Sequence, residues 1–577
     1  MPRLESLTIR NYRSIEGPIT ISLPPNGPVV MIGENNAGKS NIVRALDMVL
    51  GHAWTGTHDP DDHEFYGRNR ALEIEITAKF DREHLLADRY SEAIWTFNVA
   101  RAGAASHNVA PSRDERRHTD YMSNDIKSTC LCVVVEADRN LNYQLSYSTR
   151  WTFLSKLMHA FHKTLVEDED TRNELEHLFQ EVKQRFERVQ PYAEFVANLA
   201  EQLEGFAGTM THRLEVDFQA YNPVNFFHAL RLHAVEDGVP RTLAELGTGE
   251  QQILALSFAY AYATAFHQGI VLVVEEPEAH LHPLAQQWLA RHMHELAAGG
   301  FQIVLTTHSP HFIDVESLDG LVLVRRTERG TTVRQLIKPD LVAHCVELGA
   351  PADRVTVDNI APFYASMATP QILEGFFAKV VVLVEGPTEA LTLPVYLERV
   401  GLTPAREGVA IVPVGGKGNL GKWHRLFAAY GIPTFVVFDN DGTQDDRRGL
   451  KRRDALAALG IAAEDHDAVL EAHGIEVRHQ FMVFGRNFEE ELRDQLAGYA
   501  DAETAAETTG IDAKPFVAKW VAGSLDLDEN PGWEAFRQFA AAVRALIPRA
   551  PGNAANPAAE REAARGNVAR LAPRRLG

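Results

Sequence analysis

Residues 33–40 constrain the fold of this chain more than any other stretch, because they match the pattern G-x-x-x-x-G-K-S. The match lies between an apolar segment at residues 29–32, which predicts a buried strand, and a helical run at residues 41–46. This order predicts a P-loop whose backbone N–H groups cradle the phosphates of ATP. The residues expected to bind the nucleotide are Gly33, Asn35, Asn36, Gly38, Lys39, Ser40 and Asn41, with the Ser40 hydroxyl as a ligand of magnesium.

Length and charge set limits on the rest of the chain. A chain of 577 residues is long for a single core and predicts roughly two to four domains. The longest apolar runs are far shorter than the roughly 20 residues of a membrane span, and residues 1–5 do not resemble a signal peptide. We therefore expect a cytoplasmic protein with no membrane partner, and its three cysteines fit a reducing compartment. The formal net charge of -21 argues against a generic basic nucleic-acid binder, but it allows local basic surfaces.

The pattern along the chain predicts an α/β fold. Alternation over residues 4–14 predicts an edge strand that pairs with residues 19–23. Further strands are expected at residues 71–80, 270–274, 303–307, 380–384 and 435–438. Between residues 151 and 203, apolar residues recur at helical spacing, which fits either a dimerisation arm or an insertion packed on its own domain. Residues 541–577 are rich in Ala, Pro and Arg, so we expect their last part to be disordered, either as a solubilising tail or as one that touches DNA.

Acidic residues at the end of a second buried strand predict an ATPase site. The strand at residues 270–274 runs into Glu275, which would hold magnesium directly or through water, and Glu276, which would orient the attacking water. His308 follows another strand and is placed to sense the γ-phosphate. Upstream, residues 246–252 precede a helix.

Taken in order, these segments resemble the ATP-binding-cassette (ABC) ATPases of the chromosome-maintenance and recombination-mediator type. The resemblance implies that a signature loop, here Gly247, Thr248 and Gly249, completes the ATP site of another subunit, and that the heads dimerise with ATP. Two residues depart from the family pattern. Gly247 stands where a serine is usual, and Glu275 stands where the Walker B aspartate is usual, so the departures concern hydrolysis more than ATP binding.

Two later strands also end in carboxylates. The strand at residues 380–384 runs into Glu385, with Glu389 one helical turn further on, and the strand at residues 435–438 runs into Asp439 and Asp441. We expect these four carboxylates to converge at the carboxyl edge of a parallel sheet, where hard oxygen ligands suit Mg2+ or Mn2+. Two such ions would activate a water and stabilise the leaving oxygen in phosphodiester cleavage.

This order of motifs resembles the Toprim domain of topoisomerases, primases and certain nucleases, and residues 412–419 fit the glycine-rich segment of that family. Residues 487–492 offer a further metal ligand, with Glu489 favoured over Glu490, although a charged helical face explains the run equally well. Lys514 resembles the late lysine of Toprim nucleases, which would stabilise developing phosphate charge. The basic residues that follow the second strand would hold DNA or lie on a solvated helix: Arg447, Arg448, Lys451, Arg452 and Arg453.

An ABC-type ATPase followed by a Toprim domain in one chain resembles the OLD (overcoming lysogenization defect) family of ATP-dependent endonucleases, which includes the nuclease subunit of the Gabija phage-defence system. The resemblance covers residues 1–545. It implies metal-dependent cleavage or nicking of DNA, control by ATP, a homodimer or larger homo-oligomer, and a role in phage defence or DNA processing. A separately encoded helicase-like partner stays open. The alternative is an ATP-driven DNA-repair clamp of the recombination-mediator type, in which the Toprim part only binds.

The expected organisation and site follow from these motifs. The expected domains are a first ABC ATPase lobe (1–150), a helical insertion (151–220), a second ATPase lobe (221–375), a Toprim nuclease domain with C-terminal helices (376–545) and a basic tail (546–577). The expected catalytic residues are Glu276, Glu385, Asp439, Asp441 and Lys514. The expected metal ligands are Ser40, Glu275, Glu385, Glu389, Asp439, Asp441 and Glu489.

Overall fold

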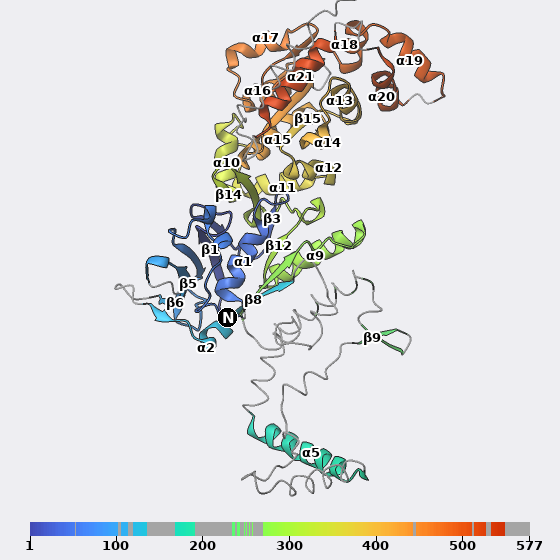
Figure 1. Ribbon diagram of the computed structural model, residues 1–577. Coiled ribbons are helices and arrows are strands. Elements are labelled where there is room, and N and C mark those ends of the chain that lie inside the picture. Colours follow the sequence, from blue (N-terminus) through green and yellow to red (C-terminus); the bar gives the residue numbers. More distant parts are fainter. Residues whose placement is uncertain are drawn as a thin grey trace, which may run out of the picture.

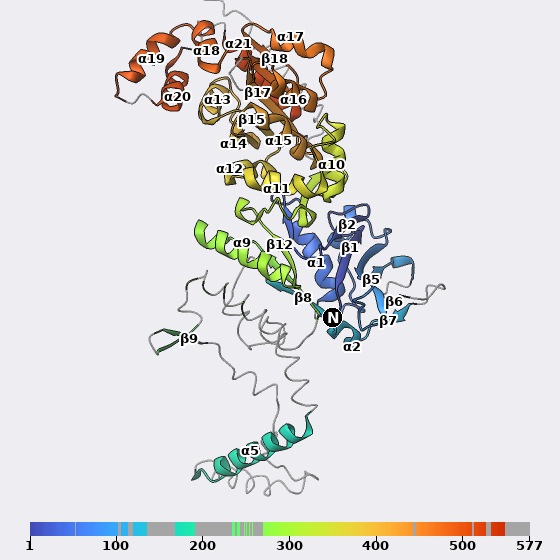
Figure 2. The ribbon, with the colours of Figure 1, turned by 180° about the vertical axis from the view of Figure 1, so that it is seen from behind.

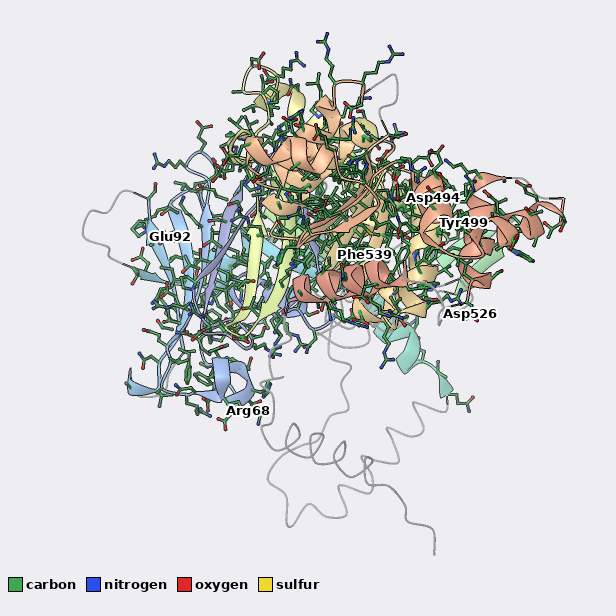
Figure 3. The ribbon with its side chains drawn as sticks, turned by 90° about the horizontal axis from the view of Figure 1, so that it is seen from above. Arg68, Glu92, Asp494, Tyr499, Asp526 and Phe539 are labelled. Atoms are coloured by element: carbon green, nitrogen blue, oxygen red, sulfur yellow. The ribbon has the colours of Figure 1, made fainter. Side chains whose placement is uncertain are left out.

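The structure is a computed structural model, and it describes most of the chain. The described residues are 1–51, 53–101, 105–112, 119–135, 168–190, 233–236, 239–242, 269–441, 446–510, 513–526 and 532–548, with residues 247, 250, 253 and 257. Three large β-sheets organise them: two form an N-terminal lobe and the third forms a C-terminal lobe (Figure 1). Seen from above, Glu92 in the N-terminal lobe and Tyr499 in the C-terminal lobe lie on opposite sides of the molecule (Figure 3).

The first sheet of the N-terminal lobe is antiparallel. Its strand order is β2 (Ile19–Ser22), β1 (Leu4–Arg10), β4 (Ile74–Phe80), β5 (Tyr90–Phe97), β6 (Ala105–Pro111) and β7 (Asp120–Tyr121). The prediction of an edge strand at residues 4–14 is wrong, because the strand ends at Arg10 and lies between β2 and β4. Its alternation reflects one buried and one open face, a pattern that inner and edge strands of an antiparallel sheet share.

The second sheet carries the P-loop. Its strand order is β14 (Gly330–Gln335), β13 (Leu321–Thr327), β3 (Val29–Ile32), β12 (Gln302–Thr306), β11 (Gly269–Glu275) and β8 (Cys130–Val135). All neighbours are parallel except β14, which runs antiparallel to β13. The helix α1 (Lys39–Leu50) packs on one face and α9 (Pro283–Ala298) on the other, which explains why β3 and β12 are apolar and buried on both faces.

The C-terminal lobe is built on a five-stranded sheet. Its order is β16 (Val409–Pro413), β15 (Val380–Val384), β17 (Thr434–Asp439), β19 (Phe481–Phe484) and β18 (Ile475–Val477), with only β18 antiparallel to its neighbour. The helices α15 (Lys417–Ala429) and α16 (Leu450–Ala458) cover one face. The helices α13 (Pro387–Arg399), α20 (Lys514–Ser524) and α21 (Trp533–Leu546) cover the other.

Shorter elements connect and flank these sheets. The helices α10 (Lys338–Glu347), α11 (Val357–Met367) and α12 (Pro370–Leu373) lie between the two lobes in both views (Figures 1 and 2). The remaining named elements are α2 (Asn124–Ser128), α5 (Glu169–Glu187), β9 (His233–Glu236), β10 (Val239–Thr242), α14 (Pro404–Glu407), α17 (His466–Leu470), α18 (Phe488–Gln495) and α19 (Tyr499–Glu507). Helix α5 confirms helical structure within residues 151–203. Most of residues 151–203 lie outside the described residues, and so do residues 549–577 of the basic tail.

One hydrophobic core crosses from the N-terminal lobe into the C-terminal lobe, and we name it the shared core. It contains Val30 and Ile32 of the strand before the P-loop together with Val381 and Leu383 of β15. The alternate residues of these strands face two other cores, one around α1 and one around α13 and α21. The sheet that carries the P-loop and the sheet that carries the C-terminal carboxylates are therefore joined by continuous apolar packing. Among the described residues, none of the helices combines the length and apolarity that a bilayer span requires.

Candidate functional site

The P-loop joins the end of β3 to the start of α1. Its two glycines have positive φ angles, 147° at Gly33 and 114° at Gly38. A Cβ atom at Gly33 would lie 2.1 Å from the carbonyl oxygen of Val324, and one at Gly38 would lie 2.3 Å from Thr331 Oγ1. Only glycine therefore suits either position, both for its backbone freedom and for the close packing around it.

The exposed face of the P-loop is open to a nucleotide. Asn35, Asn36 and Ser40 are exposed, whereas Lys39 is buried. The Lys39 ammonium folds back over the loop and donates to the carbonyl oxygens of Gly33 (2.8 Å) and Glu34 (3.1 Å). Burial lowers the pKa of Lys39, and the acids at the end of β11 oppose that shift. These acids are therefore close enough to Lys39 to act on it electrostatically.

Side chains from distant segments support the loop from behind. Asn41 Nδ2 donates to Ser14 Oγ at 2.7 Å, and Ser14 Oγ also lies 2.7 Å from Thr331 Oγ1. The Thr331 hydroxyl in turn donates to the carbonyl oxygen of Ala37 at 2.8 Å. The sequence reasoning missed Ser14 and Thr331, because nothing near either residue marks it as a neighbour of the P-loop.

The predicted ATPase acids Glu275 and Glu276 lie at the end of β11, which β12 separates from the P-loop strand β3. Glu276 has a φ of 46°, and its N–H donates to the carbonyl oxygen of Thr306 at 2.8 Å, which anchors it to the neighbouring strand. A non-glycine residue in this conformation stores backbone strain, as residues at functional sites often do. Burial lowers the pKa of His308, and the charge of Lys39 acts in the same direction. The structure thus brings Lys39, Glu276 and His308 into one electrostatic neighbourhood.

Glu278 links the acids of β11 to the histidine loop, and the sequence reasoning missed it. Its carboxylate accepts hydrogen bonds from Thr307 Oγ1 at 2.9 Å and from the His308 N–H at 2.6 Å. Burial raises the pKa of Glu278, and the nearby Glu276 adds to the shift. The sequence signal that could have identified Glu278 is its position as the third acid in a short run after a buried strand.

The predicted signature loop is described only at its first residue. Gly247 and Glu250 are exposed, and the Gly247 N–H donates to Glu250 Oε2 at 2.9 Å. Thr248 and Gly249 lie outside the described residues. Their roles at the ATP site of a second subunit stay predictions.

The predicted acids of the C-terminal lobe gather at the carboxyl edge of its sheet. Glu385 follows β15, and its Oε1 accepts a hydrogen bond from the Asp439 N–H at 2.8 Å. Asp439 ends β17, and its Oδ2 accepts from the Phe488 N–H at 3.0 Å. Glu389, in the first turn of α13, accepts from the Gly386 N–H at 3.1 Å. Asp439 is therefore held by its backbone and its side chain at once.

A further acid joins this edge from α18. Glu489 forms an ion pair with Lys514 at 2.9 Å, and its side chain is 13% exposed. The next residue, Glu490, is exposed. Asn487 caps the helix by accepting from the Glu490 N–H, which fixes how α18 starts. The geometry therefore places Glu489, rather than Glu490, beside the other acids.

The carboxylates act on one another electrostatically. Burial raises the pKa of Glu385 to about 8, and the Asp439 carboxylate adds to the shift. Burial raises the pKa of Asp439 to about 7, with contributions from Glu389 and Glu489. Burial also raises the pKa of Glu389, and Glu489 adds to it. A divalent cation would relieve this repulsion, so the donor set, all hard carboxylate oxygens, fits magnesium or manganese.

This carboxylate set is not drawn together around one point. Within the described part of the chain, no three His, Cys, Asp or Glu side chains are close enough together to hold an ion as they stand. The charge and the donor atoms at this sheet edge suit a metal ion, but the side chains do not form a complete set of ligands around one point.

The basic residues after β17 divide into structural and exposed ones. Arg452 is buried and pairs with the buried Asp446 at 2.9 Å, so it belongs to the core. Arg453 pairs with Asp467. The hypothesis that this run contacts DNA is thus wrong for Arg452, whose guanidinium already has buried partners. Arg447 and Arg448 are exposed, and Lys451 is half-buried.

The fold and its two sites define a class: a P-loop ATPase joined to a Toprim domain in one chain. Residues 3–146 and 111–313 match the family described as AAA ATPase domain, a span of more than half of the chain. The chain belongs to that family. Residues 376–441 match the family described as Overcoming lysogenization defect protein-like, TOPRIM domain.

Three curated relatives are similar to this chain over most of its length. The OLD nuclease of Thermus scotoductus is 27% identical over 465 residues, which cover 77% of this chain and 83% of the relative. The Old nuclease of Escherichia phage P2 is 22% identical, covering 76% and 77%. The endonuclease GajA of Bacillus cereus is 21% identical, covering 76% and 75%. The resemblance to the OLD family that the motifs predicted is therefore confirmed, as is the α/β class with its ATPase and Toprim domains.

Proposed function

We propose that this protein is a nucleotide-regulated, divalent-metal-dependent DNA endonuclease. The C-terminal lobe would cleave or nick phosphodiester bonds, and the N-terminal lobe would bind and hydrolyse ATP. The observation that carries the proposal is that Glu385, Glu389, Asp439 and Glu489 are neighbours at one sheet edge, in a chain that also has a P-loop. The names of the relatives, OLD nuclease and endonuclease GajA, support it.

In this proposal the residues at the sheet edge hold and orient the reacting groups. Glu385, Glu389, Asp439, Asp441 and Glu489 are the ligands for Mg2+, with Mn2+ as an alternative. The ions supply a Lewis acid and an activated water when bound. Asp439 cannot swing freely, because Phe488 N–H holds its carboxylate. Lys514, whose side chain is 67% exposed beside Glu489, offers its ammonium to the charge that develops on the phosphate.

The proposed ATPase site uses residues of the P-loop and of the segment that follows β11. Ser40 and Glu275 are the proposed magnesium ligands, and Glu276 orients the attacking water. Lys39 must leave the carbonyl oxygens that it now contacts in order to reach the β- and γ-phosphates. The signature residues Gly247, Thr248 and Gly249 of a second copy complete the site, so the proposal includes a homodimer or larger homo-oligomer.

The remaining partners follow from charge and from the relatives. DNA would lie along the exposed cations Arg447, Arg448 and Lys514 and the half-buried Lys451, because the protein as a whole is acidic. DNA affinity should therefore fall strongly as salt rises. The same proposal includes a helicase-like partner, a location in the cytoplasm and a role in phage defence. The division into five segments with boundaries at residues 150, 220, 375 and 545 also stays a proposal.

The deciding experiment measures cleavage of supercoiled and linear DNA with Mg2+ or Mn2+, with and without ATP. Asp439→Ala should abolish cleavage while ATP binding persists, because the acid lies in the C-terminal lobe. Lys39→Ala should remove ATP binding and reveal the sign of nucleotide control. Glu490→Ala is the matched control, since this exposed acid lies next to Glu489, and it should cleave as the wild type does. DNA binding by the wild type without any metal-dependent cleavage would favour the ATP-driven repair clamp instead.

A further inference from the structure

Lys417 lies among the carboxylates at the sheet edge, and the proposed function gives it no role. It is the first residue of α15 and is 8% exposed. Its ammonium forms an ion pair with Asp441, donates to the carbonyl oxygen of Asp441 at 3.0 Å and lies 4.0 Å from Glu385 Oε1. A buried lysine needs such partners, because an uncompensated charge away from water is costly.

Lys417 lies at an unfavourable position in its helix. A cation in the first turn meets the positive end of the helix dipole, where acids are favoured. The two residues before it, Gly415 and Gly416, have positive φ angles of 75° and 115°. The Gly416 N–H donates to the backbone carbonyl oxygen of Glu385 at 2.8 Å, which ties this turn to the end of β15. The helix start is thus fixed where the ammonium reaches Glu385 and Asp441.

The two lysines at this edge are placed differently. Lys514 is mostly exposed and contacts Glu489 from the solvent side. Lys417 is buried and lies between Glu385 and Asp441, which follow two adjacent strands, β15 and β17. An ammonium is a compact point charge with three donors, so it can occupy the place of a metal ion between oxygen ligands.

We propose, on the basis of the proposed function, that Lys417 is a built-in counter-ion that stands in for a divalent ion between Glu385 and Asp441. In the ion-free protein the ammonium holds these two carboxylates in position. A divalent ion that binds to them must displace it, because two cations cannot share the same oxygens at close range. Lys417 is thus a positioning residue that weakens the binding of a divalent ion between Glu385 and Asp441. The first divalent ion therefore binds near Glu389, Asp439 and Glu489.

The test is a calorimetric titration of the full chain with Mn2+ alone, without DNA. Lys417→Gln should bind Mn2+ about ten-fold more tightly than the wild type, because the competing charge is gone. Lys422→Gln is the matched control: it lies on the same helix, and its ammonium faces the Phe363 ring at 4.7 Å and the Asn419 side chain at 3.5 Å. This control should bind Mn2+ as the wild type does. Lys417→Arg, which keeps the charge, should also show the weak wild-type affinity.

Thermal unfolding gives a second readout. Without metal, Lys417→Gln should melt at a lower temperature than the wild type, because Glu385 and Asp441 lose their cation. Saturating Mn2+ should raise its Tm by more than it raises that of the wild type. Equal Mn2+ affinity in the wild type and Lys417→Gln would overturn the inference and leave the nuclease proposal intact. Tight binding by Lys417→Arg would also overturn it, and no binding by any protein would overturn both proposals.

Discussion

At the scale of single residues, Gly38 shows how packing and backbone angle together dictate a residue type. Its φ of 114° is outside the range that side chains usually allow, and Thr331 fills the space where a Cβ would go. Thr331 also holds the P-loop backbone at Ala37. A change at Gly38 therefore disturbs the loop and its support together.

Gly38→Ala should weaken ATP binding by roughly ten-fold or more, because about 1–3 kcal/mol of backbone strain comes with a clash that displaces the loop. Calorimetric titration with ATP measures this loss. Gly67→Ala is the matched control, since Gly67 has a φ of 60° but no atom within 4 Å of the place where a Cβ would lie. It should carry only the cost of the backbone conformation and bind ATP normally; equal losses in both variants would contradict the argument.

His107 makes the antiparallel sheet sensitive to acid. It is fully buried, and burial lowers its pKa to about 3, with the charge of Lys127 acting in the same direction. In the unfolded chain a histidine titrates near pH 6.5, so its contribution to stability is present above that pH and is lost as the pH falls toward 3. Between pH 7.5 and pH 5 this single group should cost about 2 kcal/mol.

His107→Gln should therefore reduce the loss of stability between pH 7.5 and pH 5. Urea unfolding of the wild type and the variant at both pH values measures the difference. The variant lacks the titrating ring, so its free energy of unfolding should change less with pH, even if its absolute stability is lower. An identical pH dependence in the two proteins would show that His107 does not titrate on unfolding.

At the scale of elements, β13 connects the P-loop to the C-terminal lobe. Val324 packs against Gly33, and the next residue, Arg325, donates to the carbonyl oxygens of Gly431 at 3.0 Å and Ala378 at 3.1 Å. Gly431 follows the end of α15, the helix that starts at Lys417 near the carboxylates. β13 and the full length of α15 thus form a chain of contacts from the P-loop to the sheet edge of the other lobe.

Arg325→Met should reduce the effect of ATP on DNA cleavage, so that the ratio of rates with and without ATP moves toward one. The variant keeps the apolar length of the side chain but removes both bonds to the C-terminal lobe. Arg334→Met is the matched control, because Arg334 also bonds across the lobes, to the Ala429 carbonyl oxygen at 2.9 Å, but from the antiparallel edge strand β14. A loss of ATP response in Arg334→Met as large as in Arg325→Met would argue against a specific route through β13.

The elements that sequence could predict are those fixed by local chemistry. The P-loop with its flanking strand and helix is where its pattern indicated, and so are the strands that lead to Glu275, Glu385 and Asp439, because glycine geometry and buried apolar runs leave a local signal. Contacts between residues far apart in the sequence leave no such local signal. Lys417 lies in a segment that was recognised only for its glycines, and its contact with Asp441 depends on how two strands pair. The inner position of β1 is another such case.

At the scale of the whole molecule, the shared core joins the lobes. Phe427 of α15 packs against Phe376 with ring centroids 5.2 Å apart, within the same core as the strand before the P-loop. We expect one cooperative thermal transition for both lobes, and Phe427→Ala should move that whole transition down, since such a truncation costs about 3–5 kcal/mol. Scanning calorimetry checks this, and two resolved transitions in the wild type would contradict it.

The shared core also bears on how such a chain can evolve. A change of volume on one side of the contact between Tyr364 of α11 and Trp423 of α15, two rings of the shared core whose centroids lie 5.3 Å apart, must be matched on the other side, because interiors are closely packed. The two halves are therefore not interchangeable cassettes. A chimera that takes its ATPase half from one relative and its Toprim half from another should fold well only when the residues of the common interior are transplanted with them.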